Sequence, residues 1–239
     1  MFSELSARER ATYQAALRMA QDCQRGTPLE TARAIHDTLC RHIVYTVDES
    51  TEEDDTAIGA ILNGQANCDG YTDAFYLVGT LAGLTVRHQF GNVYEYDTSY
   101  GYSDSHLWNL LYLDGSWRVV DVTWDDQKDG EPRYLWFNIG YDRITRTHFW
   151  NESCSPSIIS RTPAYGRPEN EYSVRDVNDA MSVIASAARQ YPDNLVFCFD
   201  TPITKAGCQP LIDAFMQYTG SGCTYWFEDR MQTLTLSIR

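Results

Sequence analysis

The residue best suited to do chemistry in this sequence is Cys68, in the segment Asn67-Cys68-Asp69-Gly70-Tyr71. The apolar residues that follow recur at helical spacing until a stop at Gly83. We therefore expect a helix with Asn67 as its N-cap and Cys68 in its first turn. Backbone N–H groups and the helix dipole favour a thiolate there, and the thiolate is the nucleophilic form of cysteine. The alternative is a small, inert residue at a helix start, which is the commoner role of a free cysteine.

A β-hairpin is predicted downstream of Cys68. Segments 105–113 and 116–124 both have the residue pattern of strands, and Asp114-Gly115 between them is a strong signal for a tight turn. If these two residues form the loop, the register of the whole hairpin is fixed. A loop of four residues leaves that register unchanged, whereas a loop of three breaks it.

This register brings a histidine close to a carboxylate. It places Trp108 opposite Asp121 and His106 opposite Thr123, so His106 and Asp121 become diagonal neighbours on one face of the sheet. Diagonal neighbours lie about 7–8 Å apart at the backbone, which an imidazole and a carboxylate can span. A lone histidine on a strand is more often structural. A histidine with an aspartate on the same face and a cysteine at a helix start is typical of a nucleophile, a base and an orienting acid.

Three blocks of sequence, taken in this order, resemble the transglutaminase-like superfamily. They are Asn67-Cys68-Asp69-Gly70-Tyr71, Ser105-His106-Leu107-Trp108-Asn109 and Trp117-Arg118-Val119-Val120-Asp121-Val122-Thr123-Trp124-Asp125. A later segment, Tyr134-Leu135-Trp136-Phe137-Asn138-Ile139, with His148 and Trp150 after it, is similar to the tail of microbial members. The resemblance covers roughly residues 30–150.

The resemblance implies a papain-related fold and a Cys-His-Asp triad. Cys68 would be the nucleophile, His106 the general base and acid, and Asp121 the residue that orients His106. Asp69 departs from the family pattern, because many members have an uncharged residue after the cysteine. A carboxylate beside the thiol opposes thiolate formation, although it also complements the helix dipole.

The chemistry that we expect is acyl transfer through a thioester on Cys68, with a peptide or protein as substrate. The Cys68 backbone N–H, with Gln65 as a side-chain donor, would hold the oxyanion. The further candidates for oxyanion or substrate binding are Tyr71, Trp108 and Trp124. Water as acceptor gives a peptidase or amidase, and a primary amine gives a transglutaminase. We expect water, and the rival hypothesis is a non-catalytic module that binds a partner in the same cleft.

The composition of the chain argues against some classes of binding partner. The formal net charge is −14 and the pI is near 4.6, which argues against nucleic acid or an anionic membrane. The acidic run 48–55 is expected to be a solvated loop, or alternatively a region that repels anionic substrates or favours cationic ones. No apolar run is long enough to span a membrane, and no cofactor or metal is expected. The sequence as given suggests the cytoplasm, but export or a cell-surface location stays open if an N-terminal signal was removed.

The seven cysteines show no zinc-ligand spacing, and their odd number leaves at least one unpaired. Sparse, unclustered cysteines are typical of a reducing environment. Pairing among four of them stays open: Cys154, Cys198, Cys208 and Cys223.

The fold class expected is α+β, with a transglutaminase-like core of a helical half and an antiparallel sheet, followed by a small α/β appendage. Residues 1–155 would form the core, 156–170 a linker rich in proline and glycine, and 171–239 a C-terminal domain of unknown role. Helices are expected over 3–24 and after the capping box that begins at Thr27.

Three smaller expectations concern polar residues of the core. His36 and His42 are expected on solvent-facing sides of their helix. The acidic segment 125–130 fails the calcium-loop template and is expected to be a turn. The loop that contains Tyr94, Tyr96, Tyr100 and Tyr102 either lines a substrate groove or packs on itself.

Overall fold

The computed structural model describes residues 5–46, 53–94, 103–126, 132–154, 159–161 and 169–238. The chain divides into two compact units, Met1–Tyr165 and Gly166–Arg239, each with its own hydrophobic core. The division falls within the stretch 156–170 for which a linker was expected.

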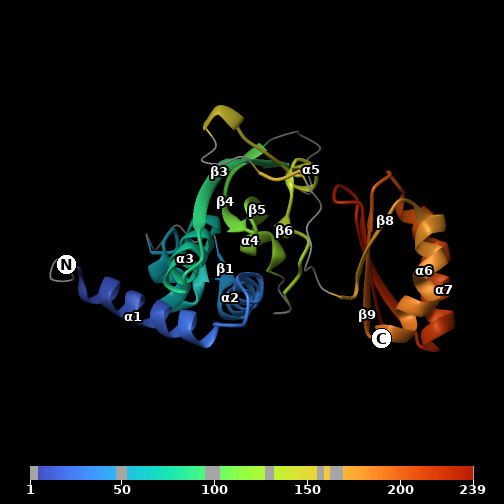
Figure 1. Ribbon diagram of the computed structural model, residues 1–239, viewed down its shortest axis with the longest axis horizontal. Helices are drawn as coiled ribbons and strands as arrows, with labels where there is room; N and C mark the ends of the chain where they lie inside the picture. The colour runs from blue at the N-terminus through green and yellow to red at the C-terminus, as the bar shows by residue number, and fades with distance from the viewer. Residues whose placement is uncertain are drawn as a thin grey trace. The chain divides into compact units, whose positions relative to one another are not determined.

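The first unit begins with two capped helices, α1 (Ala7–Asp22) and α2 (Pro28–His42). Each has a capping box, in which Ser6 pairs with Glu9 and Thr27 pairs with Glu30. The box at Ser6 explains why α1 begins at Ala7, later than the expected start at residue 3. Both helices pack against α3 (Cys68–Leu81), the helix that carries the nucleophile candidate (Figure 1).

The segment between α2 and α3 fixes the start of α3. It contains β1 (Val44–Tyr45), η1 (Gly59–Asn63) and β2 (Gln65–Ala66), and β1 pairs in parallel with β2. A Cβ atom on Gly70 would lie 2.5 Å from the Asp54 carbonyl oxygen, so only glycine permits this packing. The expectation of a solvated acidic loop is wrong for Asp54, which is buried. Residues 48–52 of that run lie outside the described residues.

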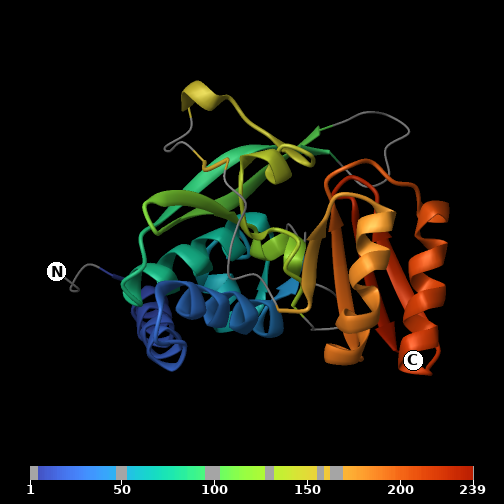
Figure 2. The ribbon, with the colours of Figure 1, turned by 45° about the vertical axis from the view of Figure 1, so that its right-hand side comes forward.

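An antiparallel sheet in the order β6-β5-β4-β3-β7 forms the other half of this unit. Its strands are β3 (Val86–Tyr94), β4 (Ser103–Leu113), β5 (Ser116–Val120), β6 (Phe137–Ile139) and β7 (His148–Phe149). Short helical turns complete the unit: α4 (Val122–Asp125), α5 (Tyr141–Ile144) and η2 (Glu152–Cys154). Figure 2 shows the sheet curled above the helices.

The hairpin of β4 and β5 has the expected register, from Leu113 opposite Ser116 to Asn109 opposite Val120. The expected length of the return strand was wrong, because β5 ends at Val120 and α4 begins at Val122. The opposed pairs predicted for Asp121 and Thr123 are therefore not formed. A register shift between Val119 and Val120 in the β5–β6 pairing bends the chain, and Asp121 then caps α4 instead of continuing the strand.

The second unit is a small α/β domain. Its elements are β8 (Glu171–Val174), α6 (Val177–Gln190), β9 (Asn194–Phe199), η3 (Lys205–Cys208), α7 (Gln209–Thr219), β10 (Cys223–Glu228) and β11 (Thr233–Ile238). The sheet order is β10-β11-β9-β8, and β8 pairs in parallel with β9 through the α6 crossover. Both α6 and α7 lie on one face of the sheet and pack on Leu195, Phe197 and Leu234 (Figures 1 and 2).

The expected α+β fold class is confirmed. No helix in the described part of the chain is long and apolar enough to cross a membrane. Of the four cysteines for which pairing stayed open, Cys198, Cys208 and Cys223 are free thiols.

Candidate active site

Cys68 is the first residue of α3, as the sequence predicted. The Asn67 side-chain oxygen accepts hydrogen bonds from the backbone N–H groups of Asp69 (3.0 Å) and Gly70 (3.3 Å), so Asn67 is the N-cap. The thiol is partly exposed, and it donates a hydrogen bond to the Asp69 carboxylate at 3.6 Å. The sulfur is therefore accessible and has an anionic neighbour on its own helix turn.

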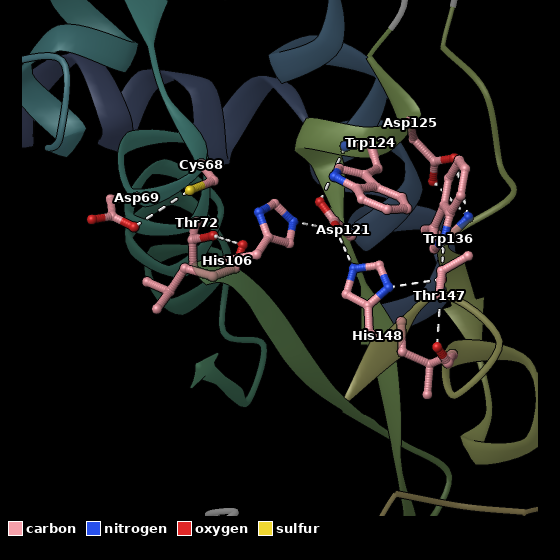
Figure 3. A network of polar contacts seen from close by, with 12 residues as sticks. Cys68, Asp69, Thr72, His106, Asp121, Trp124, Asp125, Trp136, Thr147 and His148 are labelled. Carbon is pink, nitrogen blue, oxygen red and sulfur yellow. Dashed lines mark hydrogen bonds and ion pairs between the residues drawn. The ribbon is translucent and has the colours of Figure 1, made fainter. Parts of the chain in front are cut away.

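His106 and Asp121 form a buried, hydrogen-bonded pair. The distance from His106 Nε2 to Asp121 Oδ2 is 2.7 Å, and the side chains are 5% and 1% exposed. Because Nε2 is engaged by the carboxylate, Nδ1 is the ring nitrogen left for Cys68. Figure 3 shows the ring with one nitrogen directed to Asp121 and the other on the side of Cys68.

Two opposing effects set the pKa of His106. Burial alone lowers it, but the charge and hydrogen bond of Asp121, and then the interaction with Cys68, outweigh burial and raise the pKa to about 10. At neutral pH His106 is therefore an imidazolium. An imidazolium beside a cysteine favours the thiolate.

Asp121 is held by three donors. Its Oδ2 accepts hydrogen bonds from His106 Nε2 and, at 2.9 Å, from His148 Nε2, and its Oδ1 accepts the Trp124 backbone N–H at 3.1 Å. Burial raises the pKa of Asp121, but the charge of His106 and the hydrogen bonds of both histidines hold that pKa well below its usual range. Asp121 is thus ionised over the whole range in which the protein would work.

Sequence reasoning assigned no role to His148, which is fully buried on β7. Its Nδ1 lies 2.8 Å from Thr147 Oγ1, which also accepts a hydrogen bond from Trp136 Nε1 at 3.1 Å (Figure 3). Burial lowers the pKa of His148 to about 4, despite the nearby Asp121 carboxylate. The one available signal was its place in the segment that resembled the tail of microbial relatives.

Aromatic rings surround the pair. The Trp108 ring stacks on His106 with centroids 6.0 Å apart, and the Trp124 ring lies at 5.7 Å from it. Gly91 lies opposite His106 on β3 and makes room for Trp108, because a Cβ atom there would come within 2.6 Å of that ring. The imidazole is therefore confined between two indoles.

The remaining site candidates differ in position. Trp124 is half-buried and is the one of the two indoles with a solvent-accessible face, whereas Trp108 is fully buried. Gln65 is exposed on β2, three positions before Cys68. Tyr71 is not at the surface as a substrate contact requires: it lies in the core and its hydroxyl donates to Asp126. Tyr94 is exposed, and the other three tyrosines of its loop lie outside the described residues.

A third buried histidine, His36, supports the site, and the expectation that it faces solvent was wrong. His36 is fully buried, and its Nε2 lies 3.2 Å from Asp125 Oδ2 while its Nδ1 lies 3.0 Å from Asp37. Asp125 was expected in a turn but is buried in α4, where it also accepts the Trp136 backbone N–H. This pair joins α2 to α4 and so supports the segment that carries Asp121. His42 is exposed as expected.

Among the described residues, the ligand atoms of His106, Asp121 and His148 lie within 4.8 Å of one another, a spacing that a metal ion can bridge. Each histidine Nε2 is already hydrogen-bonded to the shared oxygen, so an ion would have to displace two protons. The arrangement is better suited to stabilise a protonated His106 ring than to bind a metal ion.

Comparisons with known proteins find matches to part of this chain. A family model described as the transglutaminase-like superfamily matches residues 15–122. Kyphoscoliosis peptidase of Homo sapiens is 39% identical over 105 residues, which is 41% of this chain and 16% of that protein, and the Mus musculus protein is 39% identical over 103 residues. The match therefore spans about a sixth of the length of these curated relatives.

The solved structures that match this chain are less similar to it in sequence than the curated relatives are. A structure titled as a TGase has a TM-score of 0.41 at 13% identity, covering 55% of this chain and 36% of that one. A putative cysteine protease from Cytophaga hutchinsonii has a TM-score of 0.38 at 17% identity, covering 52% of this chain and 40% of that one. The family match includes the nucleophile helix, the β4–β5 strand pair and Asp121. Residues 15–122 of this chain are thus similar to the transglutaminase-like superfamily.

Proposed function

We propose that this chain is a thiol-dependent hydrolase of peptide or amide bonds that works through a thioester on Cys68. The observation that carries the proposal is the line from the thiol at the start of α3, through the His106 ring, to the Asp121 carboxylate at 2.7 Å. Transfer of an acyl group needs a nucleophile, a proton carrier and a group that orients the carrier. These three residues supply them in that order.

The first half of the reaction uses His106 as an acid. The Cys68 thiolate attacks the carbonyl carbon, and the backbone N–H of Cys68 donates to the developing oxyanion. The C–N bond then breaks, and the proton on His106 Nδ1 passes to the leaving amine. The products of this step are a free amine, a Cys68 thioester and a neutral imidazole.

The second half uses the neutral imidazole as a base. His106 Nδ1 takes a proton from water as the water oxygen attacks the thioester, and the C–S bond breaks to release a carboxylic acid. The thiolate and the imidazolium are then restored. Asp121 keeps its charge throughout and stabilises the imidazolium in each resting state.

The acceptor decides between two activities. With water the protein is a peptidase or amidase, which is the kind of activity that the name of the curated relatives prints. With a primary amine it is a transglutaminase, and the exposed Asp69 carboxylate beside the thiol favours a cationic amine near the acceptor position. We favour water because of its concentration in an open site.

A mass-spectrometric experiment tests the proposal. A panel of peptide and glutaminyl acyl donors is incubated with the protein, with and without an excess of a primary amine, and the acyl adduct is mapped by peptide. We expect an adduct on Cys68 and release of the free acid in both conditions. Predominant amine incorporation would make the protein a transferase. Lack of any Cys68 adduct across the panel would favour a binding module instead.

A further inference from the structure

The Asp121 carboxylate has two imidazole partners on one oxygen. His106 Nε2 and His148 Nε2 lie 2.7 and 2.9 Å from Oδ2, and the two rings are 5.5 Å apart at their centroids. A triad needs only the first of these contacts. The second histidine is fully buried and lies too deep to meet a substrate.

The hydrogen bonds behind His148 define its tautomer. Trp136 Nε1 can only donate, so Thr147 Oγ1 must accept it at 3.1 Å. Among the described residues, the Ile144 carbonyl at 3.4 Å and His148 Nδ1 at 2.8 Å can accept the single hydroxyl hydrogen of Thr147. The shorter and better contact is to Nδ1. His148 Nδ1 is therefore an acceptor, and the ring proton lies on Nε2 and points to Asp121.

We propose that His148 is a positioning residue of the active site: held as the neutral Nε2–H tautomer by Thr147, it fixes the Asp121 carboxylate against His106. This inference rests on the proposed function of the Cys68–His106–Asp121 site. With Oδ1 held by the Trp124 N–H and Oδ2 by His148, the carboxylate cannot rotate about its last bond. The imidazolium of His106 then keeps Nδ1 on the side of Cys68.

The surroundings of His148 favour this role. Its backbone pairs with Val93 in the sheet. Its ring packs edge-on against Trp108, with ring centroids 4.8 Å apart, and against Trp124, with ring centroids 4.7 Å apart. The ring is thus fixed by strand pairing and by packing. Its pKa of about 4 keeps it uncharged, so it orients Asp121 without competing for the negative charge that His106 needs.

A pair of variants separates positioning from packing. In His148→Gln the side-chain amide retains an N–H donor that reaches toward Asp121, whereas His148→Leu fills similar space with no donor. A packing role predicts that leucine is tolerated at least as well as glutamine. A positioning role predicts the reverse.

The readout is the pH profile of Cys68 alkylation by iodoacetamide, because it reports the thiolate and needs no substrate. In the wild type we expect fast alkylation at pH 6–7. His148→Leu should lose on the order of tenfold at that pH, whereas His148→Gln should stay within about threefold of the wild type. An unchanged profile in His148→Leu, or equal losses in two variants with native near-UV spectra, would overturn the proposal.

A second measurement uses the unmodified protein and holds even if the leucine variant does not fold. Long-range proton–nitrogen NMR spectra of the imidazoles should show His148 as the neutral Nε2–H tautomer from pH 5 to pH 9. An Nδ1–H tautomer or a charged ring would overturn the proposal. Failure of the proposed function is distinct: it appears as absence of a Cys68 acyl adduct while the alkylation contrast persists.

Discussion

His106 Nε2 lies 2.7 Å from Asp121 Oδ2, although Asp121 lies one residue beyond the end of β5 and is not paired with β4. Its side chain reaches His106 as the cap of a four-residue helix. The Trp124 N–H that completes the cap is therefore also a restraint on the carboxylate that orients the imidazole. Asp121 therefore has two roles: it caps α4 and it orients the His106 ring.

Replacing Asp121 by asparagine should abolish most of the turnover. The Asn amide would place a donor against both histidine Nε2–H groups, which drives the His106 proton to the nitrogen that faces Cys68. We expect a loss on the order of 10²–10⁴-fold, as when the acid of a Ser-His-Asp triad is removed. The remaining amide oxygen can still cap α4, so the fold should persist with a modest loss of stability. Steady-state kinetics and thermal unfolding measure the two effects.

Thr123→Val is the matched control for that variant. Its hydroxyl is buried and has no hydrogen-bond partner in the part of the chain that the structure describes. Removing it should leave turnover unchanged and stability unchanged or slightly improved. Near-normal turnover in Asp121→Asn, under conditions where Cys68→Ala is inactive, would contradict the triad.

Asp69→Asn should make Cys68 more reactive. The exposed carboxylate 3.6 Å from the sulfur opposes the thiolate by like-charge repulsion, and an amide would remove that charge. Because the site is open to solvent, we expect a gain of roughly fivefold at most in the iodoacetamide rate at pH 7 and low salt. Cys223, a partly exposed thiol whose pKa burial raises, is the internal reference in peptide mapping. A slower Cys68 rate in this variant would show that Asp69 assists the thiolate through the helix dipole.

Gly91→Ala should disturb the active site by displacing the Trp108 ring that packs on His106. The added methyl group would lie 2.6 Å from both the Trp108 ring and the Phe149 carbonyl oxygen, so Trp108 must move against His106. Overpacking of this kind costs about 1–3 kcal/mol of unfolding free energy. Turnover should fall together with the melting temperature. Gly26→Ala, where the nearest atom is a Glu30 carboxylate oxygen at 3.5 Å, should have little effect on either. An unchanged melting temperature in Gly91→Ala would show that Trp108 has room to shift.

The sequence was sufficient for the parts of the site that local rules control. Asn67 as a cap, Cys68 in the first helical turn and the two-residue turn at Asp114-Gly115 all depend on neighbouring residues, and the structure has each of them. The pairing register followed from the turn alone. These predictions required no knowledge of tertiary contacts.

The missed features are all long-range. His148 joins the site from 27 positions after Asp121, through a two-residue strand that pairs with β3, and no local pattern indicates so short an element. His36 is buried because Asp125 lies 89 positions away in a helix that the strand pattern of 116–124 concealed. Alternating apolar residues near Val120 are typical of a strand, but the β5–β6 register shift and the Asp121 cap prevailed.

The buried, neutral His148 gives a pH signature in stability. Its folded pKa of about 4 lies below the ordinary value near 6.5, so between these values the unfolded chain binds a proton that the folded chain does not. The free energy of unfolding should therefore fall as the pH drops from 6.5 toward 4. The size of this contribution is on the order of 3 kcal/mol. His148→Gln has no such group, and its stability should fall less over the same range.

The other shifted groups of the site are present in both the wild type and His148→Gln, so their contributions to the pH dependence cancel when the two proteins are compared; one of them is Asp125, whose pKa burial raises. The pKa values of His106 and His36 are raised, so the stability they contribute is complete below 6.5, and the pKa of Asp121 is lowered, so its contribution is lost only below its ordinary value near 3.9. Urea unfolding at pH 4.5, 5.5 and 6.5, for the wild type and for His148→Gln, isolates the difference between the two proteins. If the free energies of unfolding of the two proteins changed with pH in parallel, His148 would be protonated in the folded state. The proposal of a neutral His148 ring that donates to Asp121 would then be wrong.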